Sequence, residues 1–259
     1  MNIKDFLDEA ANRINTPSFI DNDPVQFPRR YSRLQDIEIA ALLTATIAWG
    51  NRKTILTDAE RMLSKLGSSP YDFVMGEGYK TLGTANVHRT LFEPDLAYFL
   101  KGLKQIYNGW GCLNHFFRNF QIDKTEAPIW EATRFLRAAL LDANGRYNTK
   151  CIPASFETSA LKRLNLAFHW LVRNDGIVDL GVWDCITPAQ LYIPLDVHVG
   201  NTARQLGLLT RKSNDRKAVE ELTRVLREFQ PEDPTLYDFA LFGVGANGEN
   251  IQKQWLKDS

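Results

Sequence analysis

The sequence predicts an all-α protein. Apolar residues recur at helical spacing in most segments, no alternating strand pattern runs for long, and cap residues separate the segments. Asn51 and Ser213 are N-cap candidates, and Gly67 and Gly207 are candidates for helix stops. We expect helices over residues 2–15, 36–48, 52–66, 93–108, 112–121, 126–143, 157–173, 198–206, 214–228 and 235–243.

The helix over 36–48 is apolar on nearly every face, which predicts a position in the middle of the protein. Its neighbour over 52–66 is amphipathic, and the turn Trp49-Gly50-Asn51 joins the two. Glycine, proline and asparagine predict irregular backbone over three further segments. These segments are 67–92, 144–156 and 174–195.

The helix over 157–173 carries two distinct stripes of side chains. The first stripe has the spacing of a core-facing surface and consists of Leu161, Leu164, Phe168 and Leu171. The adjacent stripe is polar and consists of Lys162, Asn165 and His169, a pattern also typical of a solvated helix face. Because Lys162 lies within a turn of the helix start, the helix dipole and apolar neighbours should favour its neutral amine. A nucleophilic lysine needs that form.

The segment after residue 193 predicts a capped helix start. Pro194 fixes an extended approach, and Asp196 then stands at an N-cap with its carboxylate toward the free amides of the next turn. Most aspartates in such a position are only caps. A catalytic carboxylate is the alternative.

Composition limits the classes of function. The chain has 31 basic and 31 acidic side chains, which argues against a purely electrostatic nucleic-acid binder. A local basic face from Arg29-Arg30, Arg52-Lys53 and residues 211–217 remains open. The three cysteines form no CxxC pair, so we expect no metal site and no cofactor, in a reducing compartment. Without a signal peptide or a long apolar run, the expected location is the cytoplasm, with no membrane partner.

The Pro-x-Asp-x-His-Val run at residues 194–199, opening a helix that ends Arg-x-Leu-Gly at 204–207, resembles a known motif. It is similar to the catalytic-aspartate segment of the helix-hairpin-helix (HhH-GPD) DNA glycosylases of the endonuclease III type. Residues 38–63 resemble that family's early Leu-Leu-Ser-x-Gln region, residues 162–165 its catalytic-lysine helix, and residues 237–243 its closing helix. The resemblance covers about half of the chain, and the whole chain also resembles an uncharacterised bacterial family.

The resemblance implies a two-lobed helical glycosylase fold, a partner and a site. Lobe one would span about 37–190, and lobe two about 1–36 plus 191–259, in one globular unit. The implied activity is a base-excision glycosylase and AP lyase that flips a damaged base, oxidised bases included, out of double-stranded DNA, acting as a monomer. Lys162 would be the nucleophile, and Asp196 would stabilise charge at the sugar. Further substrate-binding candidates are Trp49, Asn51, Arg52, Asn165, His169, Trp183 and His198.

Three features depart from the family pattern. The hairpin is normally glycine-rich so that its amides reach a phosphate, whereas residues 152–159 contain no glycine. Lys162 and Asp196 are 34 residues apart, a longer interval than usual. The iron–sulfur loop found in some members is absent. Archaeal 8-oxoguanine glycosylases of this superfamily share the altered hairpin and the longer interval.

Two alternatives therefore stay open beside the glycosylase. The glycine-free hairpin favours a binding protein that keeps the glycosylase fold without its chemistry. Zero net charge favours an enzyme acting on small nucleosides. Three of the site candidates can also have a role outside substrate binding: Asn51 as a helix cap, Arg52 as a surface charge and Trp183 as a core residue.

Overall fold

The computed structural model describes residues 2–146 and 150–246, and in these ranges the protein is predominantly helical, as predicted. The α-helices are α1 (Ile3–Ile14), α2 (Pro17–Ile20), α3 (Leu34–Ile47), α4 (Arg52–Ser64), α5 (Pro70–Met75), α6 (Glu93–Trp110), α7 (Leu113–Asn119), α8 (Pro128–Asn144), α9 (Lys162–Val172), α10 (Val197–Gln205), α11 (Arg216–Phe229) and α12 (Tyr237–Ala246). Strands β1 (Asn86–His88) and β2 (Leu91–Phe92) form an antiparallel pair. The 3-10 helices are η1 (Pro24–Gln26), η2 (Pro28–Arg30), η3 (Gly78–Thr81), η4 (Ile122–Lys124), η5 (Pro188–Gln190) and η6 (Pro234–Leu236).

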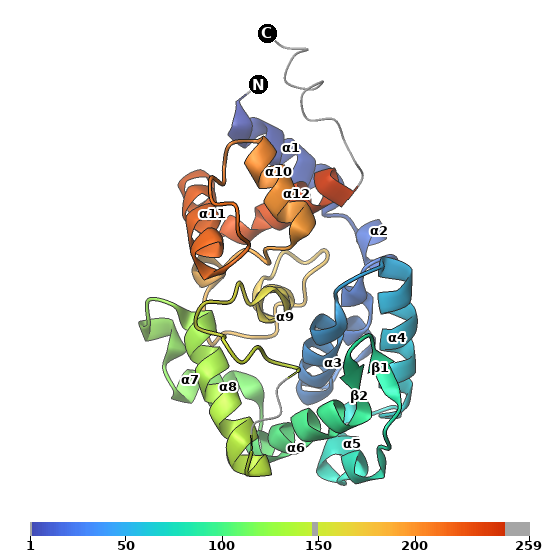
Figure 1. Ribbon diagram of the computed structural model, residues 1–259. Helices are drawn as coiled ribbons and strands as arrows, with labels where there is room; N and C mark the ends of the chain where they lie inside the picture. Colours follow the sequence, from blue (N-terminus) through green and yellow to red (C-terminus); the bar gives the residue numbers. More distant parts are fainter. Residues whose placement is uncertain (1, 147–149, 247–259) are drawn as a thin grey trace.

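Helices from the two ends of the sequence lie side by side. Figure 1 shows α1 beside α10 and α12, with α3 to α8 gathered at the opposite end of the molecule and α9 between the two groups. The packing agrees with this view, because α12 contacts both α1 and α10, while α3 contacts α9. The predicted lobe boundaries near residues 37 and 191 stay a prediction.

Helix α3 lies in the core, as its apolar sequence predicts. Glu38, in the second turn of α3, is a buried acidic residue. Its carboxylate accepts hydrogen bonds from the amides of Leu113 (3.0 Å) and Asn114 (3.1 Å) at the start of α7. It also accepts one from Trp183 Nε1 at 2.8 Å. Trp183 packs edge-on against Phe117 and is itself buried. Burial raises the pKa of Glu38 to about 7, although these donors oppose the rise.

Trp183 is therefore a core residue. The expectation that it lines a base-binding pocket is wrong, since its indole N–H is used by Glu38 and its ring by neighbouring aromatic rings. A buried tryptophan usually finds such a partner for its polar atom. Trp183 serves to connect the loop after α9 to α3 and α7.

The prediction that residues 67–92 are irregular is also wrong. This segment forms α5, η3 and the hairpin of β1 and β2. Ser69 caps α5 through the amide of Asp72, and Pro70 occupies the first helical position. The predicted break at 144–156 follows the end of α8, and residues 147–149 of it lie outside the described residues.

Helix α9 begins well after its predicted start, and helix α11 has a different cap from the predicted one. Helix α9 begins at Lys162 rather than at 157, because residues 154–158 form turns and Ser159 makes an isolated antiparallel bridge with Asp215. Helix α11 is capped by Asp215, whose carboxylate accepts from the amide of Ala218 at 3.1 Å, and not by Ser213. Asp215 thus both pairs with Ser159 in the bridge and caps α11.

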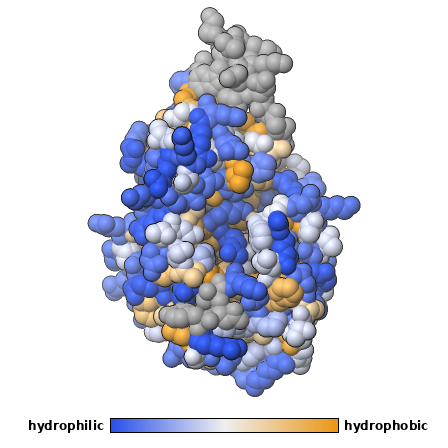
Figure 2. Space-filling view, in the orientation of Figure 1, coloured by the Kyte–Doolittle hydropathy of each residue, from blue (hydrophilic) through white to orange (hydrophobic). Residues whose placement is uncertain are grey.

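The surface seen in Figure 2 is mostly hydrophilic, with apolar residues in small scattered patches. In the part of the chain that the structure describes, no helix combines the length and the apolar character needed to cross a membrane. The large apolar side chains exposed there are Trp49, Phe92, Trp110 and Val197.

Candidate functional site

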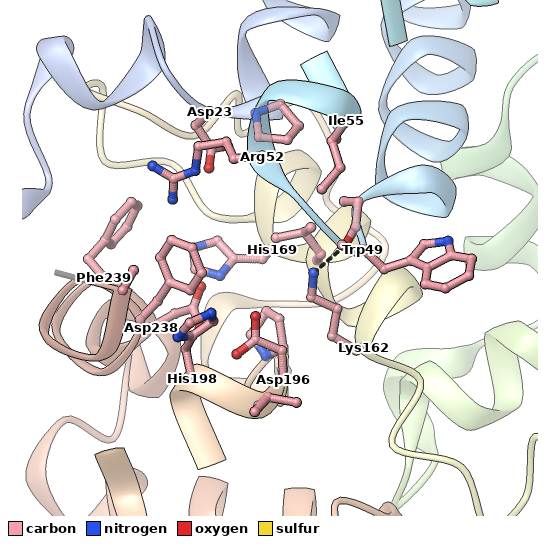
Figure 3. Close-up of a pocket in the computed structure, with 18 of the residues that line it drawn as sticks. Asp23, Trp49, Arg52, Ile55, Lys162, His169, Asp196, His198, Asp238 and Phe239 are labelled. Atoms are coloured by element: carbon pink, nitrogen blue, oxygen red, sulfur yellow. Dashed lines mark hydrogen bonds between the residues drawn. The ribbon is translucent and has the colours of Figure 1, made fainter. Parts of the chain in front are cut away.

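A cavity of about 790 Å³ lies where α9, α10, α12 and the turn between α3 and α4 converge. Two of the exposed apolar residues, Trp49 and Val197, line it. Lys162 and Asp196, which are distant in sequence, line it as well, and Figure 3 shows their polar ends directed toward the same space. The structure thus brings together the two residues that the sequence singled out for chemistry.

Lys162 is the first residue of α9, and its side chain reaches across to the end of α3. Its Nζ donates a hydrogen bond of 2.7 Å to the backbone oxygen of Ala48. Burial lowers the pKa of Lys162, and the nearby carboxylates of Asp196 and Asp238 oppose the effect only in part. The position at the positive end of the helix dipole acts in the same direction as burial. The amine is therefore easier to deprotonate than an ordinary lysine.

Asp196 is the N-cap of α10, as predicted. Its Oδ1 accepts the amide of Val199 at 2.9 Å, and its backbone oxygen accepts Asn214 Nδ2 at 2.9 Å. The cap fixes the direction of the carboxylate, and the second bond ties the preceding loop to the segment before α11. Because only one of the two carboxylate oxygens is bound by the cap, Asp196 combines a structural role with a place on the cavity wall.

The turn from α3 to α4 forms one edge of the cavity with Trp49, Asn51 and Arg52. Gly50 has a φ of 106°, a backbone conformation that side-chain-bearing residues rarely adopt, so the turn depends on glycine there. Asn51 caps α4 through the amide of Thr54 at 3.3 Å. Arg52 extends over the ring of Phe242 at 5.2 Å from the ring centre. All three predicted turn residues therefore reach the site.

The polar stripe of α9 is not a solvated face. His169 lines the cavity and is 2% exposed, while Asn165 is fully buried and does not line it. Asn165 donates from Nδ2 to the backbone oxygen of Ala160 at 2.9 Å, which secures the turn before α9. Asn165 therefore lies outside the cavity, and its predicted role in substrate binding stays a prediction. Asn165 supports the helix that carries Lys162.

His169 is held from behind by a charged cluster. Its Nε2 lies 3.1 Å from Asp179 Oδ2, and the same oxygen accepts Arg173 Nη1 at 2.7 Å. Burial acts against protonation of the ring, yet the negative Asp179 outweighs it and raises the pKa of His169. His198, by contrast, stands exposed on the first turn of α10 and lines the cavity beside Phe242, with its ring centre 6.0 Å away.

Sequence reasoning missed two carboxyl groups of the cavity, Asp23 and Asp238. Burial raises the pKa of Asp23 to about 6, and burial together with Asp196 raises the pKa of Asp238 to about 7. It also missed three aromatic rings that line the same space, those of Phe19, Phe239 and Phe242. Asp238 and these rings carry no local signal, because helix packing over long distances in sequence brings them to the site.

Residues 152–159, where the resembling family has its glycine-rich hairpin, make contacts within the protein. Their carbonyl oxygens are used inside the protein: Thr158 accepts the amide of Arg216 at 2.9 Å, and Ser159 accepts Trp130 Nε1 at 3.2 Å. Leu161, the residue before α9, adopts a φ of 48° without being glycine. This stretch is thus fixed to α8 and α11. No group of three or more metal-ligating His, Cys, Asp or Glu side chains occurs among residues 2–146 and 150–246.

Comparison with known proteins identifies a family. The family described as "Protein of unknown function (DUF2400)" matches residues 23–247. No curated protein and no solved structure matches the chain. The matched range begins at Asp23 and includes the whole set of polar residues on the cavity wall.

Proposed function

We propose that this chain, which belongs to the DUF2400 family, is a DNA base-excision enzyme that removes a damaged base and cleaves the resulting abasic site. One observation carries the proposal: the buried amine of Lys162 and the carboxylate of Asp196 line a single cavity. The resemblance of residues 194–207 to the catalytic segment of HhH-GPD glycosylases supplies the reaction class.

The nucleophile in this proposal is the neutral amine of Lys162. It attacks C1′ of the deoxyribose, and the bond from C1′ to the base nitrogen breaks with its electron pair leaving on the base. The lowered pKa of Lys162 supports this role, because a larger fraction of the amine is unprotonated at neutral pH. The hydrogen bond to Ala48 holds Nζ in place before attack.

Asp196 takes the proton that the attacking amine loses. The resulting carboxylic acid then protonates the ring oxygen of the sugar as the C1′–O bond breaks and the C1′=N bond of a Schiff base forms. As long as it is ionised, the carboxylate also stabilises positive charge that develops at the sugar. A base lost in this way leaves a covalent enzyme–DNA intermediate. Loss of a C2′ proton to water then forms the C2′=C3′ bond as the C3′–O bond breaks, and the strand is cleaved with the 3′ phosphate as the leaving group.

The walls of the cavity suit a flipped base. Phe239 and Phe242 on α12 and Phe19 provide apolar ring surfaces for a planar heterocycle. Trp49, with the Arg89 guanidinium 4.2 Å above its ring, stands exposed on the adjoining turn. We propose that Trp49, Asn51 and Arg52 fill the gap left in the duplex, the role that the corresponding region has in the resembling family.

One observation favours a second candidate function, a nucleic-acid-binding protein without chemistry. The stretch before α9 lacks the glycine-rich hairpin and uses its carbonyl groups internally, which removes a phosphate anchor of the family pattern. Such a protein would shift duplex DNA in a gel in a salt-dependent manner and release no base. An enzyme on small nucleosides would instead bind free modified bases and show no affinity for duplex.

Borohydride trapping tests the proposed chemistry. The intact protein is incubated with a duplex containing one abasic site, and borohydride reduces the C=N bond of any Schiff base to a stable amine. We expect a covalent adduct with the wild type and none with Lys162→Gln, because the glutamine amide is not a nucleophile. Lys101→Gln, at an exposed position of α6, is the matched control and should trap like the wild type.

Two results would contradict the proposal. A wild-type protein that forms no adduct on abasic DNA, and releases no base from duplexes with single lesions, is not a glycosylase of this kind. An adduct that persists in Lys162→Gln would assign the nucleophile to a different residue.

A further inference from the structure

Asp238, on the cavity wall, has a carboxyl oxygen that no described residue contacts through a hydrogen bond. It lies in the first turn of α12, and Figure 3 shows it beside His169 and His198. Its Oδ1 is shielded from solvent and has no hydrogen-bond partner among the residues that the structure describes. The two other carboxyls of the cavity differ, because Oδ1 of Asp196 accepts the amide of Val199 and Oδ1 of Asp23 accepts that of Val25.

His169 has a matching unused atom. Its Nε2 is engaged by Asp179, while its Nδ1 is shielded from solvent and also lacks a partner within the described ranges. Arg173 fixes Asp179 through a hydrogen bond of 2.7 Å, so the ring is held from one side only. A buried polar atom without a partner is costly and therefore marks a place where a ligand or a proton is to be supplied.

We propose that Asp238 is the acid that protonates the departing base. His169, which Asp179 holds from its other side, lies beside it. This inference rests on the proposed glycosylase function. It assigns a residue to the protonation of the leaving base, a step that Lys162 and Asp196 do not perform. The ligand it implies is a base that presents a ring nitrogen or carbonyl oxygen to α12.

Protons and electrons balance across the step. As Lys162 attacks C1′, the glycosidic electron pair moves onto the base, and the Asp238 carboxyl transfers its proton to an acceptor atom of that base. Asp238 becomes a carboxylate, Asp196 takes the proton from the amine, and the base leaves neutral. Solvent that enters after the base has left returns a proton to Asp238.

The surroundings of Asp238 suit a group that carries a proton near neutral pH. Burial raises its pKa to about 7, and the negative charges of Asp196 and Asp179 add to the rise. His169 and Lys162 on α9 oppose it. The remaining charged or titratable groups that line the cavity are His198 at the start of α10, Arg52 on α4 and Asp23 before η1.

The test separates base removal from strand cleavage. Single-turnover rates are measured on two duplexes, one with a single 8-oxoguanine and one with a single abasic site, between pH 5 and 9. If the wild type does not excise 8-oxoguanine, duplexes with thymine glycol, uracil or hypoxanthine take its place. We expect Asp238→Asn to slow excision about 100-fold and to leave abasic-site cleavage within about twofold, because no base has to leave there.

The pH profile gives a second readout that a purely structural role would not change. Wild-type excision should fall as pH rises through about 7, where the Asp238 carboxyl loses its proton, and Asp238→Asn should lack this descending limb. Asp21→Asn, which makes the same change at an exposed position, should behave as the wild type in both assays.

Each other outcome is decisive. Equal losses in excision and abasic-site cleavage would make Asp238 a structural residue and overturn the inference, as would a descending limb that persists in Asp238→Asn. Abasic-site cleavage by the wild type without excision of any of the four bases would also overturn it, while the Lys162 chemistry stands. A wild type inactive on both kinds of duplex would sink the proposed function itself and the inference with it.

Discussion

A carboxyl group that is shielded from water costs free energy when it ionises, and Asp238 is such a group. Its pKa of about 7 in the folded protein lies well above the value of 3.8 that it has when exposed. Since the folded-state pKa is the higher one, the cost is absent below pH 3.8, grows between the two values and is complete above about 7. The cavity therefore contains a group that weakens the fold at alkaline pH.

The first prediction concerns stability at this residue. Asp238→Asn should equal the wild type near pH 4 and exceed it by about 2 kcal/mol at pH 8.5, because the asparagine has no charge to desolvate. Urea unfolding at the two pH values measures the difference. A variant with the same gain at both values would show that charge is not the cause.

Lys162 and Asp196 could be predicted from the sequence because each stands at a helix start, where spacing and capping give a local signal. Asp238 could not be predicted in this way. Its importance comes from the packing of α12 against α10 and from its proximity to α9, which no local pattern encodes. The same holds for Asn165. The polar stripe correctly indicates that Lys162, Asn165 and His169 share a face of α9, but it does not indicate which of these side chains reaches the cavity.

At the scale of elements, long periodic segments were predictable and short ones were not. Helices α3, α4 and α10 begin and end within a few residues of the prediction, because their apolar spacing and caps are continuous. Helix α5 and the hairpin of β1 and β2 are too short to establish a period, so Gly and Asn between residues 67 and 92 indicated only loops.

The second prediction concerns the start of α11. Asp215→Ala should lower the free energy of unfolding by about 1–2 kcal/mol, because it removes the cap and the ion pair with Arg211. Ser213→Ala, at the residue that the sequence favoured as the cap, should change it by less than about 0.5 kcal/mol. Urea denaturation of both variants tests the assignment, and a larger loss from Ser213→Ala would reverse it.

The third prediction concerns the connection between α3 and α7. Glu38→Ala should cost about 3 kcal/mol of stability, because two helix-start amides and the indole N–H of Trp183 lose their acceptor. Glu60→Ala is the matched control on α4, where the exposed pair with Arg30 should contribute less than about 1 kcal/mol. Equal losses in thermal or urea unfolding would contradict a special role for Glu38.

At the scale of the whole molecule, three arginines of the basic clusters are paired with acidic side chains. Arg30 pairs with Glu60, Arg211 with Asp215, and Arg216 with Glu220. The exposed residues Arg52 and Lys53 lie at the start of α4, and Arg52 lines the cavity. A balanced chain with paired surface cations makes few phosphate contacts when it binds DNA.

The fourth prediction follows from this charge arrangement. Duplex binding should weaken only about tenfold between 50 and 200 mM salt, as expected for about two neutralised phosphates. Arg52→Gln should make the slope of log affinity against log salt shallower by about one. Fluorescence anisotropy over a salt series measures both, and a slope that Arg52→Gln leaves unchanged would place the phosphate contacts elsewhere.

The packing of α1 against α12 has a consequence for biosynthesis. The apolar side of α1, including Leu7, Ala10 and Ala11, is synthesised before α12, so it gains this partner only after the helices between them have been made. Until then the cavity beside Lys162 lacks the wall that Asp238, Phe239 and Phe242 provide. The cavity is thus completed only when α12 has packed between α1 and α10.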